Sequence, residues 1–489
     1  MPEPTCYPWA RLIPLTRTRG CVREWPIVGP APVVAAQAAV FRDLCDNQRQ
    51  FRHCQHDVTG LIVLPNKSMA NIARCILDRA DNTNLARVLS EAPGREDVVN
   101  RRRIRFMLQQ TKPHRRRRRE SLVVLDETLG DHVGSLFDDV DRHYHHRDGT
   151  YPLAHNPVTS FSVSGPVRFP LGLRLYRRYE ELTQWEAALA QHFPDLPISR
   201  ENKARNRLHQ QVAPMLLQDP EFRGRHEPFR TTIALAIDLG EEAIRCKVSF
   251  GVVVFDAWSL AEDLVRVLAR RRKAWISLLN KHRGLETASF QRRDVNGWAL
   301  KLPGPHIAVE DLVPLIPANA YRPIKVSEQT YWCFTLGGRI AGLGQVRLVV
   351  SFEDEVLTGR SVVLVTNRVD WSAAKIIGLY LQRWPTETFD QDSKGHLGFN
   401  EYRMRSIAAI GKHGGVVFVA YSLLHLTCLP AVPDRTKGLI HTMGDACRHQ
   451  GRMLLQRLLV FVHDQLSHGA MVDHLFAQLV AKQRGMVSV

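Results

Sequence analysis

The chain has 489 residues, 44% of them hydrophobic, which is enough for two or three domains with a substantial buried core. A net charge of +17 and a pI near 9.7 favour a polyanionic partner. The nine cysteines include no C-x-x-C pair, which argues against a zinc ribbon or a disulfide framework and favours a reducing compartment.

Neither a membrane segment nor a secretion signal is expected. No apolar run in the sequence reaches the length of a membrane span. Residues 1–15 lack the continuous apolar core of a signal peptide. We therefore expect a cytoplasmic protein with no membrane partner.

The first 120 residues predict an extension followed by a helical domain. Residues 1–35 are rich in proline and without clear periodicity, which predicts a loosely ordered extension. Within residues 36–120, short amphipathic segments at 67–77, 82–92 and 95–108 predict helices. Asn82 or Asn84 is suited to cap the second of these helices. This pattern suits any small helical bundle, including one that binds DNA.

Basic residues are concentrated in three runs. Residues 1–120 hold 22 Lys or Arg against 11 Asp or Glu. The first run is RRRIR at residues 101–105 and the second is RRRRR at residues 115–119, and a third, Arg270–Lys273, follows later. Charge runs are often only solvated surface, but in a DNA enzyme they are expected to follow the phosphate backbone without reading sequence. The predicted DNA contacts from the first two runs are Arg101, Arg102, Arg103, Arg115, Arg116, Arg117, Arg118 and Arg119.

Two acidic residues each follow a strongly apolar strand. Leu122–Leu125 lead directly into Asp126, and Val252–Phe255 lead into Asp256. Apolar runs of this kind predict strands buried on both faces, as in a parallel or mixed α/β sheet. An Asp at such a strand end lies at the rim of the sheet, where ligands bind. Neither acid means much alone, because Asp often closes a strand as a turn former.

Two further acids lie close to Asp126 in the sequence, and both are set aside. Glu127 is expected on the opposite face of the strand, and Asp131 lies beyond a turn.

From Ser121 onward, the predicted strands and helices follow in the order β-β-β-α-β-α-β-α, which includes the two strands that end at Asp126 and Asp256. Alternating segments separated by glycine-rich turns predict an antiparallel β-rich insertion at about 279–360.

The segment from Ile376 to Lys394 predicts one helix with a functional face. Tyr380, Arg383, Glu387 and Lys394 fall at i, i+3, i+7 and i+14, within an arc about 60° wide. A carboxylate flanked by cations suits a site that holds a metal and binds phosphate. Pro385 is expected to kink this helix near Trp384. The alternative is a surface helix with ion pairs.

The spacing Y-x2-R-x3-E-x6-K resembles the Tyr-Arg-Glu-Lys signature of bacterial insertion-sequence DDE transposases. The likeness extends over about residues 51–426 and includes LDETLGDHVG, HNPVTSFSVSG, FGVVVFDAWSLAEDL and HLGFNEYRMRSIAAIGKHGG. It implies a ribonuclease-H-like catalytic domain at residues 121–426 that carries the β-rich insertion. It also implies an N-terminal domain that binds transposon ends, while residues 427–489 are expected to form C-terminal helices that serve as core or subunit contact.

The resemblance implies a chemistry for these residues. Asp126, Asp256 and Glu387 would hold two Mg²⁺ ions, for which Mn²⁺ is an expected substitute, and would cut and join DNA strands. Tyr380, Arg383 and Lys394 would contact the DNA. The expected partners are double-stranded DNA, as transposon ends and target, and a second copy of the chain in a homodimer assembled on DNA.

Two alternatives remain open. One is a stand-alone ribonuclease-H-like nuclease, against which the insertion and the Tyr-Arg-Glu-Lys segment argue. The other is a catalytically silent DNA-binding descendant, against which the three acids argue. The terminal-repeat sequence, the target preference and the cleavage route do not follow from the sequence.

Overall fold

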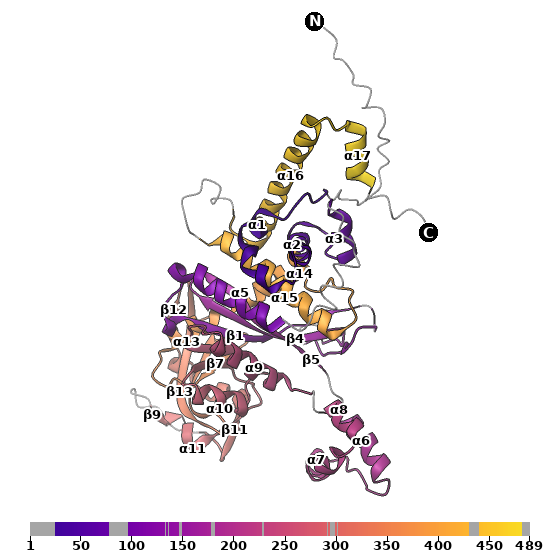
Figure 1. Cartoon of the computed structure of the whole chain (residues 1–489). Coiled ribbons are helices and arrows are strands. Elements are labelled where there is room, and N and C mark those ends of the chain that lie inside the picture. The colour runs from indigo at the N-terminus through magenta and orange to yellow at the C-terminus, as the bar shows by residue number, and fades with distance from the viewer. Residues whose placement is uncertain are drawn as a thin grey trace.

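The computed structural model combines a large mixed β-sheet with helices packed around it, so the protein is of the mixed α/β class (Figure 1). This confirms the predicted α/β class. The residues that the structure describes are 25–77, 96–132, 134, 136–145, 149–177, 181–226, 229–290, 292–293, 299–300, 302–429 and 440–481. The predicted helix at 82–92 and most of the predicted 1–35 extension lie outside these residues.

The centre of the sheet has the strand order β5-β4-β1-β6-β7. Strand β4 is antiparallel to both of its neighbours, β5 and β1, whereas β6 and β7 run parallel to β1. The strand bounds are β1 Leu122–Glu127, β4 Leu153–Ser164, β5 Val167–Tyr176, β6 Val252–Phe255 and β7 Ala274–Leu278. Leu122–Leu125 and Val252–Phe255 are buried, as their continuous apolar sequences predict for strands covered on both faces.

The segment after β7 extends this sheet by antiparallel pairing on β7. The outer strands are β15 Val362–Thr366, β14 Gly344–Phe352, β13 Gln329–Ile340 and β12 Arg322–Val326, in this order away from β7. The antiparallel character predicted for the 279–360 region is confirmed. The smaller elements of the chain are β2 Gly130–Asp131, β3 Asp141–Arg142, β8 Gly284–Glu286, α11 Thr287–Phe290, β9 Arg292–Arg293, β10 Ala299–Leu300, β11 His306–Ala308 and α12 Val309–Leu312.

The N-terminal and C-terminal helices pack together into one core with the sheet. Helix α15 contacts β5 and helices α2, α5 and α16. The bounds are α1 Pro32–Gln37, α2 Gln48–Val63, α3 Met69–Cys75, α5 Glu96–Gln110, α15 Ile407–Cys428, α16 Met443–Ser467 and α17 Val472–Ala481. A single hydrophobic cluster joins all of these helices except α17 to the sheet, so the N-terminal helices share their core with the sheet and with α15 and α16. Ile27 and Val34, from the predicted extension, are buried in it.

A helical insert follows β5. Its helices are α6 Glu181–His192, α7 Asn202–Leu216 and α8 Pro220–His226. They enclose a separate small core that includes Trp185, Val212 and Phe222, and they project away from the sheet (Figure 1). The chain then returns to the sheet through α9 Thr232–Arg245, which leads into β6, and α10 Glu262–Arg270 connects β6 to β7.

The expectation that no apolar run reaches the length of a membrane span does not hold for α15, which is the one helix among the described residues that is long and apolar enough to cross a membrane. Most of its apolar window, 67%, is buried inside the protein. Its contacts with β5, α2, α5 and α16 account for that burial.

Candidate active site

The register of the sheet brings Asp126 and Asp256 side by side. Strands β1 and β6 are parallel neighbours with Leu122 opposite Val252. Continuing this register by four residues places Asp126 level with Asp256, on strands that lie about 5 Å apart. The backbone around Asp256 is held by Ser277, whose Oγ donates to the Asp256 carbonyl at 2.9 Å. The Asp256 carboxylate Oδ1 accepts a hydrogen bond from the Ser259 backbone N at 3.1 Å.

Arg383 connects the third acid to this pair. Its Nη1 donates to Asp126 Oδ2 at 2.9 Å, and its Nη2 donates to Glu387 Oε1. Glu387 lies in the first turn of helix α14, Trp384–Leu397. One guanidinium therefore bridges two of the three predicted metal ligands.

Repulsion among the acids is visible in the pKa of Asp126. Its side chain is only 19% exposed. Burial raises the pKa of Asp126 to about 7, Arg383 opposes this rise, and the charges of Asp256 and Glu387 add to it. The charges of Asp256 and Glu387 therefore lie close enough to influence Asp126, although burial is the main cause of the raised pKa.

Lys394 is held at the same end of strand β1 by two partners. Its Nζ donates to Thr128 Oγ1 at 2.6 Å and to Asp390 Oδ2 at 2.7 Å. Thr128 Oγ1 donates in turn to Asp390 Oδ1 at 2.6 Å. Thr128 follows Asp126 by two residues, so this triangle fixes the ammonium group beside the acids. Thr128 and Asp390 are not among the predicted site residues, although Asp390 lies four residues before Lys394 on one helix.

The predicted helix is interrupted near Trp384, where Pro385 was expected to kink it, but the interruption is a complete break into two helices. Helix α13 covers Ala373–Leu381, and α14 begins at Trp384. The intervening turn is closed by the Arg383 backbone N, which donates to the Tyr380 carbonyl at 2.9 Å. Pro385 lies in the first turn of α14, where its missing N–H costs nothing. Arg383 thus sits at the junction between the two helices.

Tyr380 packs next to this junction. Its ring centroid lies 6.0 Å from the Arg383 guanidinium carbon. Burial raises the pKa of the Tyr380 phenol to about 12. This half-buried ring thus lies next to the Arg383 guanidinium. All four residues of the predicted helical face therefore reach the same region, although they belong to two helices.

A fourth carboxylate, Glu127, lies near the site. Burial raises the pKa of Glu127, the amide of Asn156 opposes this rise, and the charge of Asp256 adds to it. Asn156 Nδ2 donates to Glu127 Oε2 at 3.3 Å. The sequence carries no signal for this beyond adjacency to Asp126. Asp131, the other acid set aside, is exposed on strand β2.

The structure corrects one predicted DNA contact. Arg103 is 1% exposed. Its guanidinium donates to Pro170 O at 2.7 Å, to Ser422 Oγ at 2.9 Å and to Leu171 O at 2.9 Å. Burial lowers the pKa of Arg103 to about 9. A guanidinium enclosed in this way ties α5 to β5 and α15, so the prediction that Arg103 contacts DNA is wrong.

The other two predicted DNA contacts of the first run, Arg101 and Arg102, are engaged in ion pairs. Arg102 pairs with Asp43 through two hydrogen bonds of 2.8 Å each. Arg101 pairs with Asp97 on the surface of α5. Both side chains reach solvent to some extent, but each already has a carboxylate partner.

The second run behaves differently. Arg115 is half-buried and donates to the Leu108 carbonyl at 2.9 Å. Arg116, Arg117, Arg118 and Arg119 are all exposed just before strand β1. They lie at the start of β1, whereas Asp126 lies near its end.

The donor atoms at the site suit a hard divalent cation. Asp126, Asp256 and Glu387 offer only carboxylate oxygens, the ligands that Mg²⁺ prefers. Within the described part of the chain, however, no three Asp, Glu, His or Cys side chains are assembled to hold an ion. Arg383 lies between two of the three acids. The residues therefore fit the cation chemically, provided that Arg383 leaves its position.

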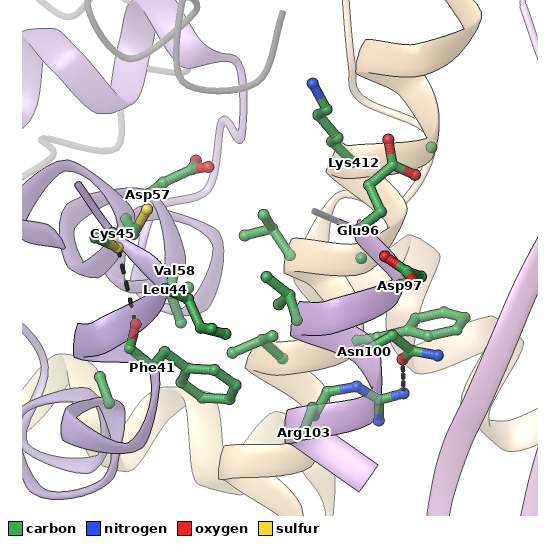
Figure 2. Close-up of a pocket in the computed structure, with 18 of the residues that line it drawn as sticks. Phe41, Leu44, Cys45, Asp57, Val58, Glu96, Asp97, Asn100, Arg103 and Lys412 are labelled. Carbon is green, nitrogen blue, oxygen red and sulfur yellow. Dashed lines mark hydrogen bonds between the residues drawn. The ribbon is translucent and has the colours of Figure 1, made fainter. Parts of the chain in front are cut away.

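A cavity of about 570 Å³ lies elsewhere, among the N-terminal helices, α5 and α15. None of the three acids lines it. Figure 2 shows Asp57 on one wall and Glu96 on the other, with apolar side chains between. Its size does not make it the reaction site, because the clustered acids lie at the sheet.

A scan against models of known protein families finds no match, and a search of curated protein sequences finds no related protein.

Proposed function

We propose that the chain is a DDE transposase, an endonuclease and polynucleotidyl transferase that binds transposon ends, cuts DNA and joins strands, in a cut-and-paste reaction. The observation that carries this proposal is the level placement of Asp126 and Asp256 on parallel strands, with Glu387 joined to them through Arg383. The strand order β5-β4-β1-β6-β7, antiparallel and then parallel, supports a ribonuclease-H-like core.

Asp126, Asp256 and Glu387 would hold two Mg²⁺ ions. When bound, such a pair activates the attacking oxygen and stabilises the leaving oxygen of a phosphodiester. The chain's own residues bind and orient the DNA. Lys394, fixed by Thr128 and Asp390, offers its ammonium group to a phosphate beside the acids. Arg383 offers a planar guanidinium that can pair with phosphate instead of with carboxylate.

Further contacts with DNA and with a second subunit complete the proposal. The N-terminal helices would bind transposon ends, and the exposed arginines before β1 would contact the backbone. A homodimer assembled on DNA is supported by large apolar side chains exposed on the last two helices, which are Leu459, Val460, Leu466, Val472 and Phe476. The proposed location is the cytoplasm, on the nucleoid when DNA is bound.

Substitution of the acids tests this function. Asp126→Ala, Asp256→Ala and Glu387→Gln should each abolish Mg²⁺-dependent cleavage of DNA that flanks the gene, because each removes a carboxylate ligand. DNA binding, measured by a gel-shift assay, should persist because the basic surface is unchanged. The matched control is Asp131→Ala, an exposed nearby acid, which should cleave like the wild type. Cleavage by any of the three variants would remove that residue from the site.

The same assay separates the alternatives. A wild-type chain that cuts DNA but never joins strands would be a stand-alone nuclease. A wild-type chain that binds the DNA but never cuts it with Mg²⁺ or Mn²⁺ would be a silent descendant.

A further inference from the structure

The sheet gathers several basic segments at the edge opposite the acids. Parallel pairing sets Leu122, Val252 and Ala274 level with one another at the starts of β1, β6 and β7. Antiparallel pairing places Val163 opposite Leu122, so the turn between β4 and β5 lies at this edge too. Segments more than 150 residues apart in the chain therefore end at one rim of the sheet.

Exposed cations dominate this rim, which we call the basic edge. Within residues 115–121, 164–168, 245–251 and 268–274 the sequence has a single acid, Glu120. Arg271 is neutralised by Glu241, with two hydrogen bonds of 2.8 and 2.7 Å. The basic edge consists of the exposed residues Arg116, Arg117, Arg118, Arg119, Arg168, Arg245, Lys247, Arg270 and Arg272.

Contacts below the surface hold these segments against one another. Arg118 Nε donates to the Phe250 carbonyl at 3.3 Å, and Lys273 Nζ donates to the same carbonyl at 2.7 Å. Lys273 Nζ lies 3.7 Å from the centre of the Phe250 ring. The Arg116 backbone N donates to Ser164 Oγ at 2.9 Å. The backbone of the basic edge is therefore fixed, and no ion pair to a described residue occupies the guanidinium groups of Arg116, Arg117, Arg270 and Arg272.

The basic edge is separate from the acids. Ser121 and Asp126 are five residues apart on one strand, which corresponds to about 17 Å. Five base pairs of duplex span about the same length. DNA that touches only the phosphates next to the acids therefore does not reach this edge.

We propose that the basic edge binds the phosphate backbone of duplex DNA about five or more base pairs away from the point of cleavage. The inference rests on the proposed function for its partner, duplex DNA, but it requires no cleavage. Arginine forks match phosphate geometry, and a row of them without interleaved aromatic side chains gives affinity without base readout. The edge would thus anchor DNA that extends beyond the active site.

A fourfold neutralisation tests this inference. Arg116, Arg117, Arg270 and Arg272 are changed to Gln, and binding to a long duplex is measured without Mg²⁺ at several salt concentrations. The slope of log affinity against log salt should fall by up to about 3.6, because each lost phosphate contact removes roughly 0.9. On a duplex that ends within about five base pairs of the cleavage point, variant and wild type should bind alike.

The matched control neutralises Arg266, Arg322, Arg368 and Arg448, which are exposed but lie outside the basic edge. It has the same net charge as the test variant and should keep the wild-type slope. Equal slopes for both variants would overturn the inference, as would wild-type binding to anionic lipid vesicles but not to duplex DNA. Tight binding through this edge by a chain that never cleaves would refute the proposed function and leave this inference standing.

Discussion

At the residue scale, Arg383 occupies the position on which the proposed chemistry depends. Its guanidinium bridges Asp126 and Glu387, which are two of the three proposed metal ligands. Asp126 is largely buried, so its charge has little access to water and depends on a nearby cation. In the structure that cation is Arg383, which would have to be displaced, for example by a DNA phosphate, before a metal reaches the acids.

Removal of this guanidinium should therefore raise the affinity of the DNA-free protein for metal. We expect Arg383→Gln to bind Mn²⁺ more tightly than the wild type, because the carboxylates lose their competing partner. Binding can be followed by the electron paramagnetic resonance signal of free Mn²⁺. Arg383→Lys, which keeps the charge, should stay near the wild type. Unchanged affinity in Arg383→Gln would mean that Arg383 does not compete with metal.

At the element scale, strand β1 and helix α14 are joined by the triangle of Thr128, Asp390 and Lys394. The three hydrogen bonds measure 2.6, 2.6 and 2.7 Å. Because Thr128 follows the strand and the other two residues belong to the helix, the triangle fixes how the helix approaches the acids. The hydrogen bond from Lys394 to Thr128 therefore positions the ammonium group relative to strand β1, and not only relative to its own helix α14.

Loss of the Thr128 hydroxyl should slow cleavage without loss of DNA binding. Thr128→Val keeps the side-chain shape but frees Lys394, so single-turnover cleavage should slow by about tenfold, as expected for a hydrogen bond to a charged group. Thr128→Ser should retain most of the rate. In a Lys394→Ala background, Thr128→Val should have no further effect. Additive losses would show that Thr128 acts independently of Lys394.

At the scale of the whole molecule, the N-terminal helices are continuous with the core of the C-terminal helices. The cavity between α2, α5 and α15 marks this contact, and Asp57 of α2 lies in its wall (Figure 2). Its carboxylate is buried, and Oδ1 accepts no hydrogen bond from a described residue. Burial raises the pKa of Asp57 to about 7.

This buried acid should make the stability of the fold dependent on pH. The folded chain holds the Asp57 proton up to about pH 7, whereas the unfolded chain releases it near pH 4. The contribution of Asp57 to stability is thus present at low pH and is lost as pH rises through about 7. Asp57→Asn should melt at a higher temperature than the wild type at pH 8, and this difference should shrink toward pH 4. A difference independent of pH would contradict the raised pKa.

The sequence by itself determined the strands and their acids. Continuous apolar runs require burial on both faces, so Leu122–Leu125 and Val252–Phe255 form central strands that place Asp126 and Asp256 at one rim. Burial of apolar side chains depends mainly on local composition, which is why these elements could be predicted from the chain alone.

Only the tertiary structure decided how side chains from distant segments meet. The sequence predicted a kink near Trp384 but neither the complete break into two helices nor the contact of Arg383 with Asp126. A run of charged residues in a sequence does not reveal how deeply each side chain is buried. Arg103 was therefore predicted to lie on the surface, although the core encloses it. Contacts such as Thr128 with Lys394 join residues 266 positions apart. They depend on sheet register and helix packing, which are set by the whole core and not by local sequence.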